Sequence, residues 1–323
     1  MNITVILCTY NRCQVLEKAL ESVAASTVPG SIQWEVLVVD NNSSDETHSV
    51  VEDFCNRYPG RFRYLFEPKQ GKSYALNSGV REALGNILAF MDDDVFVEAE
   101  WLQNLTAALQ DGEWAGTGGR TVPTQTFKSP DWLSIDGPYC MVGILYAYFH
   151  LGDHPCELHR APYGANMAYQ KKMFEKYGMF RTDLGPSPNS QIPRPNEDTE
   201  FGRRLLAAGE RLRYEPLAVA HHPVIESRIR KDYFLAWWFD YGRAMVREWG
   251  RGRDIWGIPR PYLNILSIGA RTMVPRILRW MLALNPQRRF YWKCLVWETA
   301  GEVSEFYRLV HCEAARSEGS VQA

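Results

Sequence analysis

Several common sequence signatures are missing from this 323-residue chain, and each absence removes a class of protein. No run of about 20 apolar residues occurs, so no ordinary membrane-spanning helix is encoded. No GxGxxG follows the first apolar run, which disfavours a Rossmann dehydrogenase. The GxxxxGK[ST] phosphate loop is incomplete before Lys72, because Phe66 stands where its first glycine would be.

The sequence also lacks cysteine pairs with metal-ligand spacing, and it lacks a secretion signal. The seven cysteines are odd in number and scattered, and none forms a CxxC pair, which favours free thiols in a reducing compartment. Residues 1–7 lack a basic region and a small-residue cleavage site, so they predict a first strand instead of a signal peptide. We therefore expect a cytoplasmic protein.

The formal net charge is only −2, which removes the simplest case for a general nucleic-acid binder, and no nucleic-acid partner is expected. This small value hides an asymmetry. Residues 243–293 contain 11 basic and two acidic side chains, so this stretch carries +9 and the remainder carries −11. An acidic body is followed by a basic region.

Short apolar runs alternate with helical patterns in the first third of the chain. Strands are expected at residues 3–8, 34–39, 62–66 and 87–91, each followed by a helix. Four such units predict an α/β fold, with a Rossmann-like, mostly parallel central sheet flanked by helices. Further on, the Pro-rich segment 185–196 predicts a loop, which we expect to act as a lid on the acceptor side.

Polar residues follow each of the first four predicted strands, where ligands of such sheets bind. The four segments are 9–12, 40–45, 69–73 and 92–94. Segment 40–45 is by itself also a good turn and helix-capping sequence. The run Asp92-Asp93-Asp94 is the sharpest signal, because three adjacent carboxylates repel one another and strand capping does not require them. It indicates a divalent cation that bridges nucleotide phosphates, with a solvated acidic turn as the alternative.

Taken together, these segments resemble a family 2 glycosyltransferase of the GT-A fold. The resemblance covers about residues 2–229 and rests on five motifs in the family's order: ITVILCTYNR, EVLVVDNNSSDET, GKSYALNSGV, ILAFMDDDV and PYGANMAY followed by NEDTEFGRRLLAAG. It implies nucleotide-diphospho-sugar donors and, for most members, inversion of the anomeric carbon.

The resemblance also implies residue roles at the donor. Asp40 matches the acid that contacts uracil, since a carboxylate can accept from the base N3–H, and Arg12 would reach a phosphate. Lys72 lies where the family varies, and its phosphate role is inferred from position alone. The expected nucleotide-sugar-binding set is Thr9, Tyr10, Asn11, Arg12, Asp40, Asn42, Lys72, Asp92, Asp93, Gly164 and Asn166.

For the metal, the resemblance implies Asp94 as a direct ligand and Asp92 as a ligand through water or a ribose contact. His222 stands in the register of a third ligand, with its neighbour His221 competing and a purely structural histidine as the alternative. An oxygen-rich site with at most one imidazole suits Mn²⁺ or Mg²⁺ better than Zn²⁺.

For the chemistry, the resemblance implies Asp198 as the general base, with Glu197 second. The alternative is that these acids only begin a helix, where the helix dipole favours them. Gly164 and Asn166 would face the donor sugar and acceptor, because small residues let the backbone approach a sugar ring; a generic turn is the alternative.

The region after residue 230 is aromatic and basic, with seven of the 11 tryptophans between Trp237 and Trp297. Helical spacing gathers apolar residues of the stretch 263–281 on one side, with Arg276 and Arg279 opposite and a kink at Pro275. This pattern predicts association with an anionic membrane surface through residues 243–293. The alternative is a helix packed on the catalytic domain with its arginines in water.

We therefore expect a catalytic domain at residues 1–229, with a nucleotide-binding half at 1–112 and an acceptor-side half at 113–229. A helical region at 230–312 and a flexible tail at 313–323 follow. The expected activity is inverting, metal-dependent transfer from a nucleotide-sugar, with a UDP-sugar favoured, to a glycan or polyprenyl-linked or other lipid-linked acceptor, at the inner face of the cell membrane. The alternatives are a nucleotidyltransferase and a catalytically inactive nucleotide-sugar-binding partner at the membrane.

Overall fold

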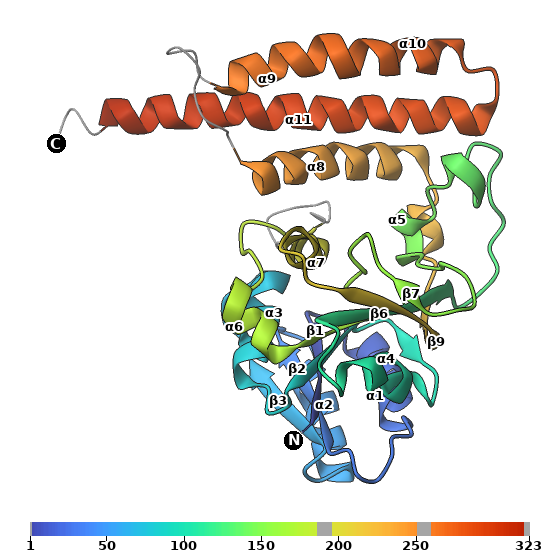
Figure 1. Cartoon of the computed structure of the whole chain (residues 1–323), viewed down its shortest axis with the longest axis vertical. Coiled ribbons are helices and arrows are strands. Elements are labelled where there is room, and N and C mark those ends of the chain that lie inside the picture. Colours follow the sequence, from blue (N-terminus) through green and yellow to red (C-terminus); the bar gives the residue numbers. More distant parts are fainter. Residues whose placement is uncertain (1, 186–195, 251–259, 320–323) are drawn as a thin grey trace. The chain divides into compact units, whose positions relative to one another are not determined.

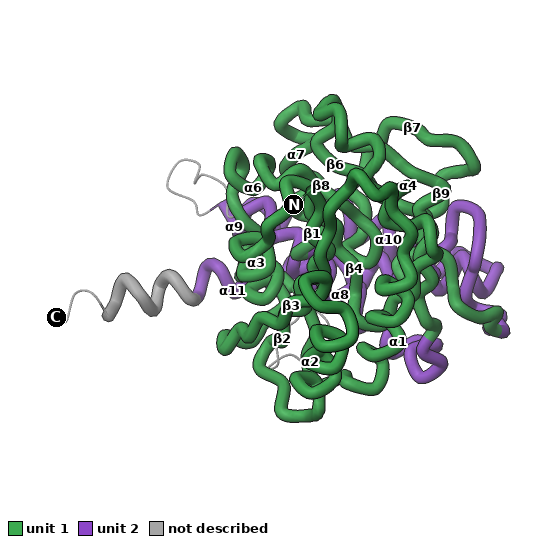
Figure 2. The backbone as a smooth tube through the Cα atoms, turned by 90° about the horizontal axis from the view of Figure 1, so that it is seen from below, with its two compact units in different colours: residues 1–127, 145–189, 197–224 green, residues 128–144, 190–196, 225–323 purple. Residues whose placement is uncertain are grey.

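The computed structural model of the chain describes residues 2–185, 196–250 and 260–319, the last eight of them as backbone only (Figure 1). The predicted Pro-rich loop, 185–196, lies outside the described residues except at its two ends. The chain forms two compact units (Figure 2). We call residues 1–127, 145–189 and 197–224 the α/β unit, and residues 128–144, 190–196 and 225–323 the helical unit.

The α/β unit contains a mixed sheet with helices between its strands. Its described strands are β1 Ile3–Thr9, β2 Trp34–Asp40, β3 Phe62–Phe66, β4 Ile87–Asp92, β5 Phe96–Val97, β6 Gly116–Pro123, β7 Cys156–Glu157, β8 Met167–Gln170 and β9 Leu212–His222. Its described helices are α1 Cys13–Ala24, α2 Thr47–Arg57, α3 Lys72–Glu82, α4 Trp101–Thr106, α6 Lys171–Tyr177 and α7 Glu197–Ala207, and α5 Gly143–Tyr146 spans the boundary to the helical unit.

The strand order is β3-β2-β1-β4-β8-β6-β9-β5, with β7 also paired to β9. The first four strands in this order are parallel, which confirms the four β-then-α units. The second half is mixed: β8 runs antiparallel to both β4 and β6, and β9 runs parallel to β6. The parallel strands therefore carry the predicted strand-end segments along one edge.

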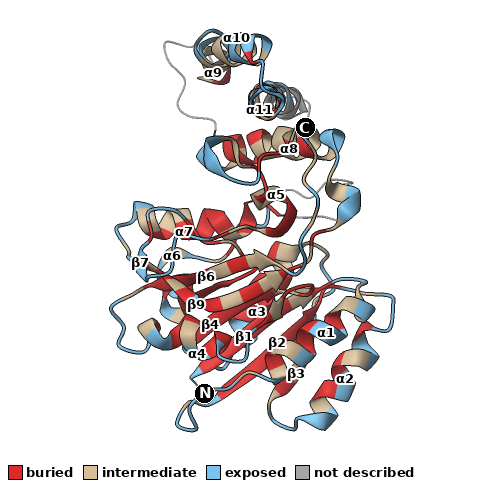
Figure 3. Cartoon of the chain, turned by 90° about the vertical axis from the view of Figure 1, so that its right-hand side faces the viewer, coloured by how far each residue is buried: buried red, intermediate tan, exposed pale blue. Residues whose placement is uncertain are grey.

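Both faces of the parallel strands are buried, as Figure 3 shows for the strands of the sheet. Val5 and Leu7 of β1 belong to one core cluster with Leu16 of α1, while Ile6 between them packs in the other with Leu76 of α3. Two buried faces explain why these strands are continuous apolar runs in the sequence.

The last strand differs from its sequence expectation. Residues 211–214 and 217–222 suggest two short strands, yet β9 is one strand from Leu212 to His222. Its pairing with β6 shifts register between Gly119 and Arg120, so the segment around Pro216 is accommodated without ending the strand. As a result, His222 lies at the end of a long strand that is paired with β6.

The helical unit contains the helices α8 Lys231–Trp249, α9 Arg260–Ile268, α10 Val274–Leu282 and α11 Pro286–Gly319. Gly242 of α8 and Gly301 of α11 permit a close crossing, because a Cβ on either would lie 2.0 Å from a carbonyl oxygen of the other helix. The predicted kink at Pro275 corresponds to a π-helical segment, Gly269–Met273, between α9 and α10.

Arg276 of α10 lies inside the helical unit, where it donates to the Leu295 carbonyl and the Thr299 hydroxyl and pairs with Glu298. Arg279, the second arginine expected on that side of the helix, is exposed. Among the described helices, none combines the length and apolarity that crossing a bilayer demands. The predicted flexible tail, 313–323, falls where side chains are not described, and the helical backbone extends to Gly319.

Candidate active site

The expected site residues lie at the carboxyl edge of the parallel strands. Thr9, the last residue of β1, is paired with Asp40, the last residue of β2. On the other side of β1, Cys8 is paired with Asp92, the last residue of β4. The three strand ends are therefore adjacent, as their parallel arrangement requires.

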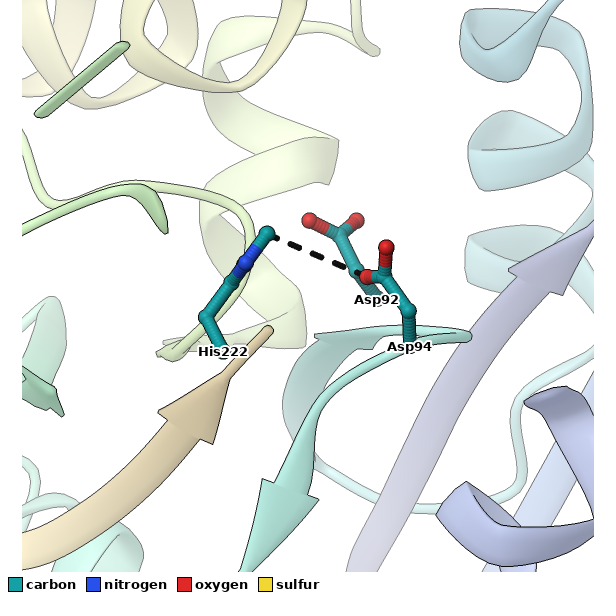
Figure 4. A group of neighbouring side chains, drawn as sticks. All are labelled: Asp92, Asp94 and His222. Atoms are coloured by element: carbon teal, nitrogen blue, oxygen red, sulfur yellow. Dashed lines mark ion pairs between the residues drawn. The ribbon is translucent and has the colours of Figure 1, made fainter. Parts of the chain in front are cut away.

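Asp92, Asp94 and His222 form a possible metal site at this edge (Figure 4). One ligand atom from each lies within 4.8 Å of the others. Asp92 ends β4, Asp94 lies in the next turn, and His222 ends β9, with its Nε2 3.8 Å from Oδ1 of Asp94. Two separate parts of the chain thus supply the three groups.

The hydrogen bonding of His222 leaves its Nε2 suited to a metal. Nδ1 lies 2.9 Å from the carbonyl oxygen of Pro223, and since a carbonyl only accepts, Nδ1 carries the proton in this contact. In the neutral ring with this tautomer, the Nε2 lone pair is on the side of Asp94, where a metal ion would bind it. The competing His221 instead contacts Glu98, at 3.2 Å.

This donor set fits a divalent cation. Two carboxylates and one neutral imidazole, with Asp94 and His222 buried, match the oxygen-rich preference of Mn²⁺ and Mg²⁺. Strand geometry ends at Asp92, so the turn and not strand alternation sets the direction of the Asp93 side chain. Asp93 accepts from the Thr9 hydroxyl at 2.8 Å.

Arg12 lies against the same acidic turn. Its Nη1 is 2.7 Å from Oδ1 of Asp93, and its Nη2 is 2.7 Å from Oδ2 of Asp94. Burial raises the pKa of Asp93 to about 6, although the Arg12 guanidinium opposes that shift. One guanidinium therefore balances two carboxylates and leaves Oδ1 of Asp94 on the side of His222.

Lys72, the first residue of α3, connects two of the predicted motifs. Its Nζ lies 2.7 Å from Oδ1 of Asp92 and 3.3 Å from Oε1 of Glu197. Burial disfavours the ammonium, yet Asp92 and Glu197 together raise the pKa of Lys72 well above its usual value. The lysine therefore stays charged and joins the acidic turn to the start of α7.

The loop that carries Lys72 is fixed by Asn41, a residue that the sequence analysis did not single out. The Asn41 amide donates to the carbonyls of Glu67 and Lys69 and accepts from the Gly71 N–H. Gly71 has φ +136°, a backbone conformation open mainly to glycine. The only sequence signal for Asn41 is its place directly after Asp40, inside a segment that also looks like an ordinary turn.

Asp198 lies at the start of α7 with both carboxylate oxygens oriented. Oδ2 accepts from the Gly164 N–H, and Oδ1 accepts from the Thr199 N–H at 2.7 Å. Gly164 permits this approach, because a Cβ there would lie 2.7 Å from Oδ2 of Asp198. Glu197 is buried, and burial raises the pKa of its carboxyl group. Asp198 is the more exposed of the two acids.

The first two loops are tied together by Asn11. Its side-chain oxygen accepts from the Ser44 N–H at 2.7 Å, and its own N–H donates to the Ser43 hydroxyl at 2.9 Å. Asn11 and Asn42 both have left-handed backbone conformations, with φ of 50° and 65°. Tyr10 and Asn42 are exposed in these loops.

Two predicted donor contacts are already engaged inside the protein. Asp40 is buried, and its carboxylate accepts from the Ser43 N–H at 2.9 Å and from the Tyr64 hydroxyl at 2.8 Å. Asn166 is not brought to the cluster: its amide accepts from Trp101 and donates to the carbonyls of residues 120 and 218. Both amide hydrogens and one lone pair of the amide oxygen are thereby used in the core.

Comparisons with known proteins identify the family of the chain. Residues 4–178 match the model of the glycosyl transferase family 2. The chain is 26% identical over 251 residues to glucosyl-dolichyl phosphate glucuronosyltransferase of Haloferax volcanii, which covers 76% of this chain and 77% of that protein. It is 27% identical over 266 residues to the succinoglycan biosynthesis protein ExoM of Rhizobium meliloti, covering 80% of each.

A solved structure supports the fold over nearly the whole chain. The mannosyltransferase PcManGT of Pyrobaculum calidifontis, solved with GDP-Man and Mn²⁺, superposes with a TM-score of 0.61. The match covers 95% of this chain and 87% of that protein at 20% sequence identity. At this identity the similarity supports the fold alone. Which ligands the present chain binds has to be argued from its own residues.

Proposed function

The chain belongs to glycosyltransferase family 2, and from this premise we propose that it moves a sugar from a nucleotide-diphospho-sugar to an acceptor hydroxyl, with inversion at the anomeric carbon. The observation that carries this proposal is the bridge made by Lys72. Its Nζ contacts Asp92 of the candidate metal site and Glu197, the neighbour of the candidate base Asp198. Groups suited to the donor and to the acceptor are thus linked within one α/β unit.

Asp198 activates the acceptor in this proposal. Its two oxygens are oriented by N–H donors from Gly164 and Thr199, and a carboxylate has further lone pairs with which to take a proton. The acceptor oxygen bonds to the anomeric carbon as its proton passes to Asp198, and the bond from that carbon to the diphosphate oxygen breaks on the opposite face. A positioned base of this kind contributes about 10²–10⁴-fold in rate.

Positive charge at the diphosphate comes from this chain's own residues and from a divalent cation. Asp92, Asp94 and His222 would hold Mn²⁺ or Mg²⁺, which supplies charge neutralisation at the departing diphosphate when bound. Arg12 and Lys72 lie against the same aspartates and would bind phosphate oxygens. Thr9, Tyr10, Asn11 and Asn42 would line the nucleotide pocket from the first two loops.

The proposed donor is a uridine nucleotide. Asp40 lies at the end of β2 with each oxygen accepting one hydrogen bond, so each retains a lone pair for the N3–H of uracil. Guanine nucleotides are the natural comparison. A UDP-sugar should stabilise the protein against thermal unfolding more than a GDP-sugar with the same sugar.

For the acceptor we propose a glycan or a lipid-linked sugar. One relative is named for glucosyl-dolichyl phosphate and another for succinoglycan biosynthesis, so related chains act in both settings. A lipid-linked acceptor would place the reaction at a membrane surface, and we propose the inner face of the cell membrane.

The proposal is tested with a panel of UDP- and GDP-sugars, assayed for hydrolysis and for thermal stabilisation with Mn²⁺, with Mg²⁺ and with EDTA. Asp198→Asn should leave donor stabilisation intact while stopping transfer. Transfer of the nucleoside monophosphate with release of sugar 1-phosphate, in place of release of a nucleoside diphosphate, would instead identify a nucleotidyltransferase. Donor binding without turnover by the unaltered chain would identify the inactive binding partner.

The metal assignment is tested by a matched pair of variants in the acidic turn. Asp94→Asn should abolish Mn²⁺-dependent donor turnover. Asp93→Asn is the comparison, because the Asp93 oxygens are directed to Thr9 and Arg12, and it should keep Mn²⁺ affinity even where donor binding falls. Equal loss of Mn²⁺ affinity in both variants, measured by titration, would contradict the assignment of Asp94 as a ligand.

A further inference from the structure

Helix α10 of the helical unit turns an apolar side to solvent. Val274, Leu278, Met281 and Leu282 on this helix are 51%, 53%, 68% and 77% exposed. Leu284, in the turn that leads to α11, is 97% exposed. We call these five residues the α10 patch. An exposed apolar surface of this size on one short segment marks an interaction site.

Of the two arginines of α10, Arg276 faces the protein and Arg279 is exposed. Arg276 donates to the Leu295 carbonyl and to the Thr299 hydroxyl, at 2.8 and 2.7 Å, and pairs with Glu298 at 3.1 Å. Trp280 packs edge-on against Trp297. A water-exposed helix normally keeps its large apolar residues inward. The exposure of the α10 patch is therefore unusual for a helix that faces only water.

Positive charge surrounds the α10 patch. Residues 260–293 contain seven basic residues and no acidic residue. Four of the arginines are exposed and lie on or beside α10: Arg271, Arg279, Arg288 and Arg289. Apolar side chains flanked by exposed arginines match a surface that is apolar within and anionic at its border.

We propose that the α10 patch rests on the anionic leaflet of a lipid bilayer, with its apolar side chains among the upper acyl chains and the four arginines at the phosphate groups. The charge pattern is what selects this occupant. A second copy seated on the same patch would bring exposed arginines against arginines, with no acidic residue in 260–293 to offset them. This docking stands independently of the proposed sugar transfer and would bring the chain to lipid-linked acceptors.

The test is flotation of the full-length protein with vesicles of 70% phosphatidylcholine and 30% phosphatidylglycerol, compared with pure phosphatidylcholine. The double variant Leu278→Glu/Met281→Glu should lower the partition coefficient by at least about tenfold. Arg288→Gln/Arg289→Gln should lower it roughly fivefold for each charge removed, and only on the anionic vesicles. Leu217→Glu is the matched control, because Leu217 is 68% exposed on β9 of the α/β unit, and it should bind like the unaltered protein.

Two further measurements accompany the flotation assay: the folding of each variant and its donor binding. Melting temperatures and circular dichroism of each variant should match the unaltered protein, since the altered side chains are exposed, and donor stabilisation should be unchanged. Failure of donor binding in all variants would count against the proposed function without affecting the lipid result. Equal flotation of Leu278→Glu/Met281→Glu and the unaltered protein would overturn the membrane proposal. So would a dimer of the unaltered protein, by light scattering, that this double variant converts to monomer.

Discussion

The ammonium of Lys72 lies 2.7 Å from a carboxylate oxygen of Asp92, 20 residues further along the chain. In this position the lysine occupies the metal-facing region of the site with a fixed positive charge. It also contacts Glu197 at 3.3 Å, so the same charge serves both motifs. We therefore expect the ion pair to compete with a cation for Asp92 and to link the acidic turn to the start of α7.

Replacing Lys72 with methionine should separate these two effects. Lys72→Met leaves two largely desolvated carboxylates without their partner, and we expect a loss of roughly 1–3 kcal/mol in unfolding free energy. Mn²⁺ affinity should rise severalfold because Asp92 is released, whereas transfer should fall. Urea unfolding, Mn²⁺ titration and steady-state rates measure the three quantities.

Two further variants control for the charge itself. Lys72→Arg keeps the charge and should recover part of the stability. Lys176→Met removes a lysine that forms an exposed 2.8 Å ion pair with Glu210, and it should change neither Mn²⁺ affinity nor rate. Weaker Mn²⁺ binding in Lys72→Met would show that the lysine supports the metal site and does not compete for it.

Gly164→Ala should displace the candidate base Asp198. The new Cβ would lie 2.7 Å from Oδ2 of Asp198, which also receives the Gly164 N–H. A displacement approaching 1 Å at a reacting group lowers rates by up to about 10²-fold, so kcat should fall by about 10- to 100-fold. Thermal stabilisation by the donor is measured in parallel, because Gly164 is also expected to face the donor sugar. A loss of kcat that exceeds any loss of donor stabilisation identifies the displacement of Asp198.

Gly30→Ala is the control for this change, since a Cβ there meets nothing within 4 Å. It should leave kcat at the value of the unaltered protein. If Gly164→Ala kept full kcat, the placement of Asp198 against this glycine would have no bearing on transfer, and Asp198 would lose its main support as the base.

The strand-end motifs were predictable because each has a local signal. Thr9, Asp40 and Asp92 each end an apolar run, and parallel strands bring such ends together whatever the loops do. The choice of His222 over its neighbour was not settled by sequence, because it depends on how β9 continues through a register shift against β6.

The contacts between distant segments carried no local signal. Lys72 and Glu197 are separated by most of the α/β unit, so their contact follows only from the complete fold. Asn166 was expected near a sugar, but the indole of Trp101 and two backbone carbonyls occupy its amide. For α10, helical spacing identified the apolar side correctly. It did not show which side faces α11, because that depends on the ion pair between Arg276 and Glu298 of α11.

Gly242 and Gly301 should be among the most sensitive positions of the helical unit. Each Cβ added there would lie 2.0 Å from a main-chain oxygen of the facing helix, so neither helix can yield by a side-chain rotation. Gly242→Ala and Gly301→Ala should each reduce the unfolding free energy by about 1–3 kcal/mol or more. The tryptophan fluorescence of this unit reports the transition in urea.

Gly269→Ala serves as the control, because a Cβ at Gly269 meets nothing within 4 Å. An alanine there should be neutral or stabilising by about 0.5–1 kcal/mol, since alanine loses less backbone entropy on folding. Unchanged stability in Gly242→Ala would contradict the close crossing of α8 and α11.

The helical unit should lose stability as the pH rises from about 4.5 to 7. Glu302 of α11 is buried, and burial, with the nearby Glu298 carboxyl group adding to it and Arg276 opposing it, raises the pKa of Glu302 from 4.5 to about 7. Between these values the folded protein keeps a proton that the unfolded chain releases. Because the unfolded state then binds fewer protons, the unfolding free energy falls with pH across this window and levels off above it.

Glu302→Gln should remove most of this slope, because the amide stays neutral at every pH. At pH 8 the variant should be more stable than the unaltered protein by up to about 3 kcal/mol, the value of the full shift. Glu305 cannot produce the same slope. Burial would raise the pKa of Glu305, but hydrogen bonds from Arg247 and Arg308 lower it to about 2. The stabilising effect of Glu305 is therefore lost only as the pH falls below about 4.5. Urea unfolding at pH 5, 6, 7 and 8 distinguishes the two, and parallel curves for Glu302→Gln and the unaltered protein would show that Glu302 is ionised throughout in the folded state.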